Sequence, residues 1–419
     1  MRLGLVQMAL GAIVVLTTST LNRLMVVELS LAAVLPGLLV ALHYGIQITR
    51  PNWGFLSDTG GHRTLWIIGG MVALAVGGLT AAWGVVVLEH DFVLGMVISV
   101  LAYGLIGLGV GASGTSLLAL LATATAPRRR AAAATITWLM MIFGIAVTAG
   151  VVGAFLDPYT PGLLMKIVAI VTGGAVVLTV LAVWGIERRV IARAEPDAMP
   201  FRAGMAEIWA EPKARMFTLF VFLSMTAYFM QELILEPYAG LVFNFTPGQS
   251  TSLSGAQNGG VFVGMLIVGI AATGFKLGAL RHWVIAGCLG SAVALIAITM
   301  IGQTGLPLLV PATVALGLFN GMFAVAAIGS MMALAGQGRG AREGTRMGLW
   351  GAAQAMAAGF GGLVGAAAVD LMRLVTDTAT AFGAVFLFEA ILFIAAAYMA
   401  ARIMDRGIAP AQTQLVPGE

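Results

Sequence analysis

Twelve apolar runs divide this sequence, and each is long enough to cross the hydrocarbon core of a lipid bilayer as a helix. No alternating barrel pattern is visible, and backbone groups inside lipid must then be paired within helices. The pattern therefore predicts an all-α membrane protein with 12 transmembrane helices. The runs fall at about 4–24, 29–49, 65–88, 92–122, 131–156, 163–186, 216–240, 252–273, 283–302, 306–335, 347–371 and 379–402.

The composition agrees with a surface that faces lipid. Hydrophobic residues make up 60% of the chain and charged residues only 10%, whereas soluble domains carry about 25% charged residues. The single cysteine, Cys288, excludes an internal disulfide framework and a multi-cysteine metal site. We expect no metal site made by the protein itself.

Basic residues are distributed unevenly between the loops. Of the 22 Lys and Arg residues, all but Arg23, Lys166 and Arg373 lie before the first run, at or after the end of the last, or in loops that follow an even-numbered run. Basic loops stay on the cytoplasmic side. Both termini are therefore predicted to be cytoplasmic, and the basic pI reflects topology, so that no nucleic-acid partner is expected.

The longest polar stretch lies between the sixth and seventh runs and divides the chain into two sets of six. We expect an N-terminal half at 1–187, a cytoplasmic linker at 188–215, a C-terminal half at 216–403 and a cytoplasmic tail at 404–419. Two halves of six helices are the arrangement of a transporter built from parallel repeats.

The loop between the second and third runs reads GFLSDTGGHRT. Its residues Gly54, Asp58, Gly61 and Arg63 match the loop signature of the major facilitator superfamily, and the glycines permit a tight reversal. This resemblance predicts a conformational loop and a major facilitator fold. The alternative is an ordinary charged turn.

Two carboxylates, Glu232 and Glu236, lie one turn apart near the end of the seventh run. A charge inside a membrane helix is costly and needs a location, a partner or a function that offsets the cost. One interpretation is a structural Arg23–Glu232 or Arg23–Glu236 ion pair. The other is a binding site for a substrate, whose further candidates are Asn22, Gln231, Gln257 and Asn258.

Four blocks carry a more specific resemblance: TLNRLMVVEL (20–29), LHYGIQITRPNWGFLSDTGGHRT (42–64), QELILEPYAGLVF (231–243) and LSGAQNGGVFVGM (253–265). They resemble the PucC/LhaA family, the bacteriochlorophyll-delivery branch of the major facilitator superfamily, along most of the chain. The resemblance implies a non-enzymatic carrier or assembly factor in the inner, intracytoplasmic membrane of a phototrophic bacterium. It would support bacteriochlorophyll delivery and assembly of light-harvesting complexes.

The same resemblance implies the partners. They are bacteriochlorophyll, light-harvesting polypeptides, pigment synthase and insertion machinery, and membrane lipid. No cofactor is required, and bacteriochlorophyll or a precursor is the expected bound guest. Some family members are named as a synthase chain, but the sequence lacks an Asp-rich motif for a prenyl diphosphate, and we expect no enzyme activity.

Three polar residues inside other runs complete the candidates. His43 has Gln47 one turn later on the same face, so that it could be an axial ligand to the pigment Mg or a hydrogen-bond partner of a neighbouring helix. Glu389 lies near the middle of the last run and must face the bundle interior. It could be a proton-coupling carboxylate, a pigment contact or a structural hydrogen-bond donor.

Two other functions stay open. One is a proton-coupled exporter of a small hydrophobic solute, with Glu389 or Glu232 as the titrating group. The other is an accessory subunit of bacteriochlorophyll synthesis.

Overall fold

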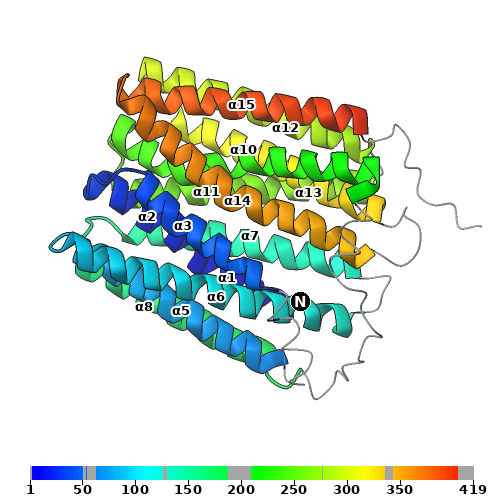
Figure 1. Ribbon diagram of the computed structural model, residues 1–419, viewed down its shortest axis with the longest axis horizontal. Coiled ribbons are helices and arrows are strands. Elements are labelled where there is room, and N and C mark those ends of the chain that lie inside the picture. The colour runs from blue at the N-terminus through cyan, green and yellow to red at the C-terminus, as the bar shows by residue number, and fades with distance from the viewer. Residues whose placement is uncertain are drawn as a thin grey trace, which may run out of the picture.

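The computed structural model describes residues 2–50, 53, 63–125, 130–186, 209–275, 277–335 and 343–403, and every regular element in them is helical. The helices lie side by side in one elongated bundle (Figure 1). Eleven of the described helices are long and apolar enough to cross a membrane, and Val34–Ile46 is a shorter apolar helix. The predicted series of apolar helices is therefore confirmed, and its second member is the shorter helix Val34–Ile46.

The first six crossings come from residues 2–183. They are α1 (Arg2–Val15), which continues through η1 (Leu16–Thr20), α2 (Leu21–Arg23) and η2 (Leu24–Glu28), then α3 (Val34–Ile46) with η3 (Gln47–Thr49), α5 (Arg63–Leu88), α6 (Phe92–Ala124), α7 (Arg130–Phe155) and α8 (Pro161–Val183). The first crossing extends past the predicted end at 24 because η1 and η2 are π-helical turns that continue it.

The last six crossings come from residues 212–403. They are α10 (Pro212–Phe243), α11 (Pro247–Val268) with the π-helical η5 (Gly269–Gly274), α12 (Leu280–Thr304), α13 (Leu309–Ala335), α14 (Glu343–Arg373) and α15 (Thr378–Ile403). Most of the predicted linker, and the predicted tail at 404–419, lie outside the described residues. The division into domains at these positions stays a prediction.

Two hydrophobic cores hold the bundle together. One is built from residues between Leu3 and Val183 together with Leu233 of α10, and the other from residues between Ala214 and Ala400. Across the two sets of helices, α3 packs against α14 and α7 packs against α11. The surface between the halves is therefore formed at these two contacts and along α10.

The described ends of the chain lie at the same end of the bundle (Figure 1). We call this end the terminal face and the opposite end the distal face. At the distal face, helices end or begin at Glu28, Val34, Leu88, Phe92, Phe155, Pro161, Phe243, Pro247, Thr304, Leu309, Arg373 and Thr378.

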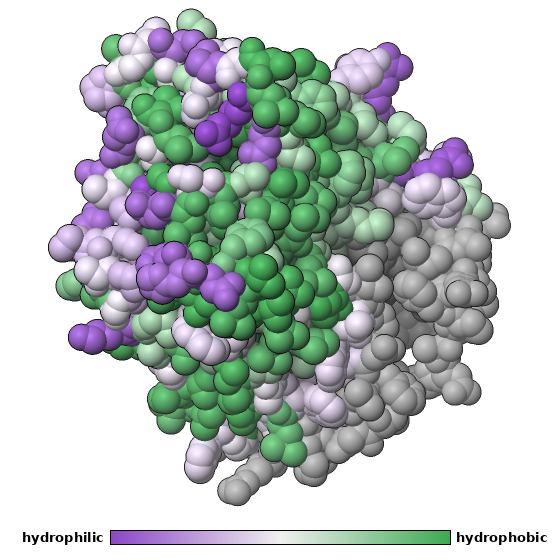
Figure 2. Space-filling model, turned by 60° about the vertical axis from the view of Figure 1, so that its left-hand side comes forward, coloured by the Kyte–Doolittle hydropathy of each residue, from purple (hydrophilic) through white to green (hydrophobic). Residues whose placement is uncertain are grey.

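The flanks of the bundle are apolar. Figure 2 shows hydrophobic side chains over much of the visible surface, with hydrophilic residues gathered toward its left. Large apolar side chains such as Val93, Leu101 and Ile170 are exposed on the outer helices. In water such a surface would drive aggregation, whereas lipid tails solvate it.

Candidate functional site between the two halves

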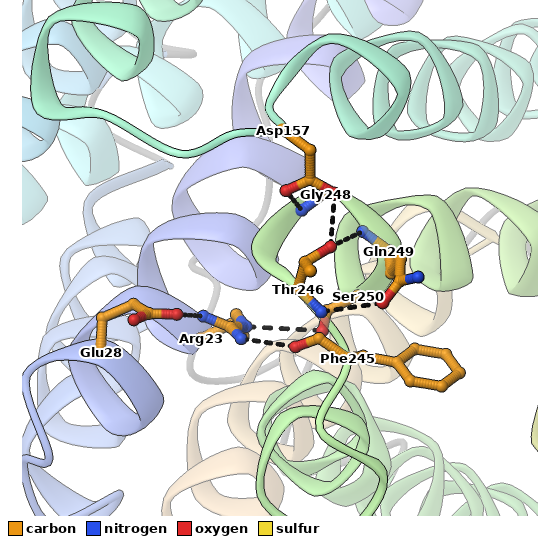
Figure 3. A network of polar contacts seen from close by, with 8 residues as sticks. All are labelled: Arg23, Glu28, Asp157, Phe245, Thr246, Gly248, Gln249 and Ser250. Atoms are coloured by element: carbon orange, nitrogen blue, oxygen red, sulfur yellow. Dashed lines mark hydrogen bonds and ion pairs between the residues drawn. The ribbon is translucent and has the colours of Figure 1, made fainter.

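The distal ends of the two halves are joined by carboxylates that cap helices of the opposite half. Asp157, just after α7, accepts hydrogen bonds from the Thr246 hydroxyl and from the Gly248 backbone N at 3.1 Å, at the start of α11 (Figure 3). Asp370 of α14 accepts from the backbone N of Ala33 at 3.0 Å and of Val34 at 2.7 Å, at the start of α3. Free N–H groups and the helix dipole make a helix N-terminus a good partner for a carboxylate.

Arg23 makes the third distal link. Its guanidinium donates to the Phe245 carbonyl oxygen at 2.7 Å and to Ser250 Oγ at 3.4 Å, both in the other half, and it forms an ion pair with Glu28 (Figure 3). The predicted ion pair of Arg23 with Glu232 or Glu236 is therefore wrong. A π-helical turn separates Arg23 from Glu28, and it brings residues five apart onto one side.

Smaller polar contacts between the halves continue along the first crossing. Together with the contacts of Asp157, Asp370 and Arg23, we call them the distal seal. Asn22 Nδ2 donates to the Leu233 carbonyl oxygen at 2.6 Å. The hydroxyls of Thr20 and Thr251 lie 3.3 Å apart, and Ser254 Oγ donates to Ser19 Oγ at 3.4 Å. The residues from the first half belong to η1 and α2, where π-helical turns interrupt the α-helix.

Glu236 lies beside this seal. It is 1% exposed, and neither of its carboxylate oxygens has a hydrogen-bond partner among the described residues. Arg23 lies close enough to act on it electrostatically, and the hydroxyl of Ser254 lies beside it. The structure therefore brings together three of the predicted candidates, Asn22, Arg23 and Glu236.

The other candidates of α11 have different surroundings. Asn258 donates to the Ser254 carbonyl oxygen of its own helix at 3.0 Å. The backbone of Gln257 packs against Gly317 of α13. Neither side chain forms a hydrogen bond with a described residue of the first half, and their predicted binding role stays a prediction.

Further toward the terminal face, aromatic side chains meet across the halves. The rings of Tyr44 on α3 and Phe229 on α10 have centroids 5.8 Å apart, and Tyr228 contacts Phe229 at 5.2 Å. Glu232 is partly exposed and lies near enough to Tyr44 and Tyr228 to act on both hydroxyls electrostatically. We call Tyr44, Tyr228, Phe229 and Glu232 the aromatic cluster.

Neither tyrosine was among the residues predicted from the sequence. Tyr228 precedes Glu232 by four residues, a spacing that places both on one face of a helix. That spacing in the sequence could have identified Tyr228 as a neighbour of Glu232. Tyr44 had no comparable signal, because its partners belong to the other half of the chain.

His43 borders this cluster, because its ring meets that of Tyr44 in an edge contact with centroids 4.6 Å apart. Its side chain is 2% exposed, and its Nε2 lies 2.9 Å from Gln47 Nε2. Arg50 donates to Gln47 Oε1. An arginine can only donate, so the oxygen of the Gln47 amide faces Arg50 and its NH₂ group faces His43.

This arrangement of donors and acceptors determines which imidazole nitrogen of His43 accepts a hydrogen bond. His43 Nε2 accepts from Gln47, and the proton therefore resides on Nδ1, which has no hydrogen-bond partner among the described residues. A magnesium ligand needs a free nitrogen lone pair. The predicted axial-ligand role of His43 stays a prediction and would require Gln47 to move.

The remaining candidates lie elsewhere. Glu389 is fully buried inside the C-terminal core, and Gln231 is buried on α10. Arg63 begins α5 and donates to the Ala119 carbonyl oxygen of α6 at 3.0 Å. The other residues of the predicted conformational loop, Gly54, Asp58 and Gly61, lie outside the described residues. In the part of the chain that the structure describes, no three His, Cys, Asp or Glu side chains form a metal-binding group.

Comparisons with curated proteins give close relatives. The chain is 67% identical to the "Bacteriochlorophyll synthase 44.5 kDa chain" of Rhodobacter capsulatus over 98% of this chain and 97% of the relative. It is 30% identical to "Protein PucC" of the same species, over 97% and 92% of the two chains. These relatives place the chain in a bacteriochlorophyll-related, photosynthetic context.

Comparisons with solved structures give the fold. A bacterial homologue of the human lysosomal transporter Spinster, in an inward-facing and occupied conformation, aligns with a TM-score of 0.69 at 14% identity, covering 98% of each chain. The nucleoside transporter NupG aligns with a TM-score of 0.71 at 11% identity, covering 96% and 99%. The predicted major facilitator fold is thus confirmed, and the chain is a multi-span membrane protein.

The family follows from a match along nearly the whole chain. Residues 20–408 match the family model described as "PUCC protein". Together with the 67% identical relative, this match confirms the resemblance seen in the four sequence blocks, and the chain belongs to the PucC family.

Proposed function

We propose that this chain is a non-enzymatic carrier that binds bacteriochlorophyll or a precursor between its halves and passes it to light-harvesting polypeptides during their assembly. The observation that carries the proposal is the aromatic cluster at the contact of α3 with α10, on the terminal side of the distal seal. The name of the 67% identical relative supports the choice of pigment.

The chemistry of the cluster suits a large, neutral, planar guest. Aromatic rings favour offset or edge contacts with another flat π-system. The hydroxyls of Tyr44 and Tyr228 and the carboxyl of Glu232 can donate to or accept from the carbonyl groups of a macrocycle. Such sites are mostly apolar, with a few placed polar groups that fix orientation.

The distal seal limits the paths by which a guest could enter or leave the space between the halves. The cross-half hydrogen bonds of Asp157, Asp370, Arg23 and Asn22 all lie toward the distal face. A guest would therefore enter or leave from the terminal face or sideways through lipid. By the distribution of basic residues we assign the terminal face, with both chain ends, to the cytoplasmic side of the inner membrane.

A carrier accounts for the fold better than a synthase does. The likeness to transporter structures extends over nearly the full length of the chain, and the halves of such folds move around a central site. We therefore interpret the synthase name of the relative as a place in the same process. Pigment synthase and insertion machinery would then be partners of the carrier.

The test is the absorption spectrum of the full-length protein purified from cells that make bacteriochlorophyll. We expect bound tetrapyrrole in the wild type and at least a several-fold lower pigment content in Tyr44→Leu and Tyr228→Leu. Val93→Leu, at a lipid-facing position of α6 that is 71% exposed, is the control and should retain the pigment. Wild-type protein without tetrapyrrole, together with normal antenna levels after deletion, would contradict the proposal.

The fold also favours a second function, a proton-coupled exporter of a small hydrophobic solute with Glu232 as the titrating group. Purified protein in liposomes should then move protons when solute is added, and Glu232→Gln should abolish this flux. An accessory role in synthesis is the third candidate. It requires prenylation activity in membranes to fall when this chain is removed.

A further inference from the structure

Four polar side chains lie at one level inside the C-terminal core, away from the surface between the halves. Gln231, Ser291, Asn320 and Glu389 come from α10, α12, α13 and α15, and each is at most 1% exposed. We call them the polar layer. Their common level follows from aromatic contacts on either side of them.

The contacts on the distal side are made by Tyr238 of α10. Its hydroxyl donates to the Ile298 carbonyl oxygen of α12 at 2.9 Å. Its ring lies 5.4 Å from Phe382 and 5.0 Å from Phe386 of α15, measured between centroids. These three helices are therefore aligned at Tyr238.

A shift of seven residues, about two helical turns, returns to the same face of each helix. α10 and α12 run toward the distal face, whereas α15 runs away from it. Counting seven residues toward the terminal face leads from Tyr238 to Gln231 on α10 and from Ile298 to Ser291 on α12. On α15 the same count leads from Phe382 to Glu389.

The contacts on the terminal side place Asn320 at the same level. Phe323 of α13 lies 6.1 Å from Phe393 of α15 and 6.3 Å from Phe220 of α10, between ring centroids. Asn320 precedes Phe323 by three residues and Glu389 precedes Phe393 by four, one turn toward the distal face in each case.

One hydrogen bond joins members of the polar layer, and five of its polar atoms have no hydrogen-bond partner in the part of the chain that the structure describes. Ser291 Oγ donates to Asn320 Oδ1 at 2.8 Å. This bond turns the Asn320 NH₂ group away from Ser291. Among the described residues, Asn320 Nδ2, both amide atoms of Gln231 and both carboxyl oxygens of Glu389 have no partner.

An ionised Glu389 would add only acceptors to this layer. The two NH₂ groups of Gln231 and Asn320 would then face its oxygens, the Gln231 oxygen would lack a donor, and a charge would lie in the membrane interior. An uncompensated buried charge is far more costly than a neutral polar group. The acid form supplies the missing donor.

We propose that Gln231, Asn320 and Glu389 form a proton-binding site inside the C-terminal half. The carboxylic acid of Glu389 donates its proton toward Gln231 Oε1, and Asn320 Nδ2 donates toward the carbonyl oxygen of the same acid. Ordered water links these groups, because buried polar atoms without protein partners are the usual sites of internal water. The site is separate from the proposed pigment contacts.

The experiment is infrared difference spectroscopy of the full-length protein at neutral pH, wild type minus Glu389→Gln. We expect the difference to contain the carbonyl stretch of one carboxylic acid. Asn320→Leu and Gln231→Leu should shift that band by changing its hydrogen bonds. Glu28→Gln, at an exposed carboxylate of the distal face, is the control and should remove only carboxylate bands.

Two results would overturn the proposal. One is loss of carboxylate bands, and not the acid band, in Glu389→Gln. The other is a thermal unfolding midpoint that rises in sodium chloride relative to choline chloride in the wild type but not in Glu389→Gln, which would identify a cation site. If Glu389→Gln fails to fold, an acid band that is identical in wild type, Gln231→Leu and Asn320→Leu contradicts the proposal.

Discussion

Asp370 accepts a hydrogen bond from the Val34 backbone N at 2.7 Å and thereby caps a helix of the opposite half. Asp157 caps α11 in the same way, through Gly248. Asp157 follows the fifth crossing and caps the eighth, whereas Asp370 lies on the eleventh and caps the second. The two caps are therefore related by the repeat of six helices.

These caps should hold the distal face closed. A cap hydrogen bond contributes about 0.5–2 kcal/mol, so the double variant Asp157→Ala/Asp370→Ala should open this face. Spin labels on the distal ends of α3 and α11, introduced after replacing Cys288 by Ala, should report longer and broader distances.

Asp377 offers a matched control for that experiment. It caps α15 within its own half, through the Thr380 backbone N at 3.0 Å. Hydrogen bonds from Thr380 also lower the pKa of Asp377. Asp377→Ala should leave the distances between the halves unchanged. Equal widening in this control would contradict a specific role for the cross-half caps.

Arg23 should contribute more to stability than its ion-pair partner does. Glu28 is 39% exposed, and exposed ion pairs contribute about 0–1 kcal/mol, so Glu28→Gln should lower the unfolding midpoint only slightly. Arg23→Leu also removes the bonds to Phe245 and Ser250, and each hydrogen bond of a charged group contributes about 1.5–3 kcal/mol. Thermal unfolding in detergent compares the two variants, and equal midpoints would refute the ranking.

Arg23→Lys should rescue only part of the loss. Lysine keeps the charge but lacks the rigid fork of donors with which arginine reaches three acceptors. We expect its unfolding midpoint to lie between those of Arg23→Leu and the wild type. A midpoint equal to that of the wild type would mean that charge alone accounts for the stabilisation.

Helix length and apolarity made the crossings predictable. The contacts of the distal seal could not be predicted in this way. Arg23 and Glu28 were assigned to a span and a loop, because π-helical continuation of a helix has no clear pattern in the sequence. Asp370 lies at the end of the eleventh predicted run and was not among the candidate residues. Its partner Val34 lies in the other half, and nothing in a single sequence links residues 336 positions apart.

The candidate residues show the same limit. Glu232 and Glu236 stood out in the sequence as carboxylates in an apolar run, but the neighbours that decide their roles come from α3, α2 and α11. The Tyr44–Phe229 contact joins the halves through shape alone. Packing between distant segments, which decides such contacts, is what composition and periodicity do not encode.

A glycine lets α7 and α11 approach closely. A Cβ added to Gly255 would lie 2.6 Å from the Gly150 backbone N, whereas one added to Gly259 of the same helix meets nothing within 4 Å. Backbone cannot yield as a flexible side chain can, and overpacking costs about 1–3 kcal/mol. Gly255→Ala should therefore lower the unfolding midpoint, and Gly259→Ala should not. Equal midpoints for the two variants would contradict the close contact.

The hydrogen bonds from Arg50 to Gln47 and from Gln47 to His43 predict which imidazole nitrogen of His43 carries the proton. Because Arg50 binds the Gln47 oxygen, the imidazole of His43 should be neutral with its proton on Nδ1. Nitrogen NMR of ¹⁵N-histidine-labelled protein distinguishes the two tautomers, and His43→Asn identifies the signal. Arg50→Leu frees the amide to rotate, and we expect the proton of His43 to shift toward Nε2. A wild-type signal from the Nε2–H tautomer would contradict the assigned hydrogen bonds, and it would mean that Gln47 presents its oxygen to His43.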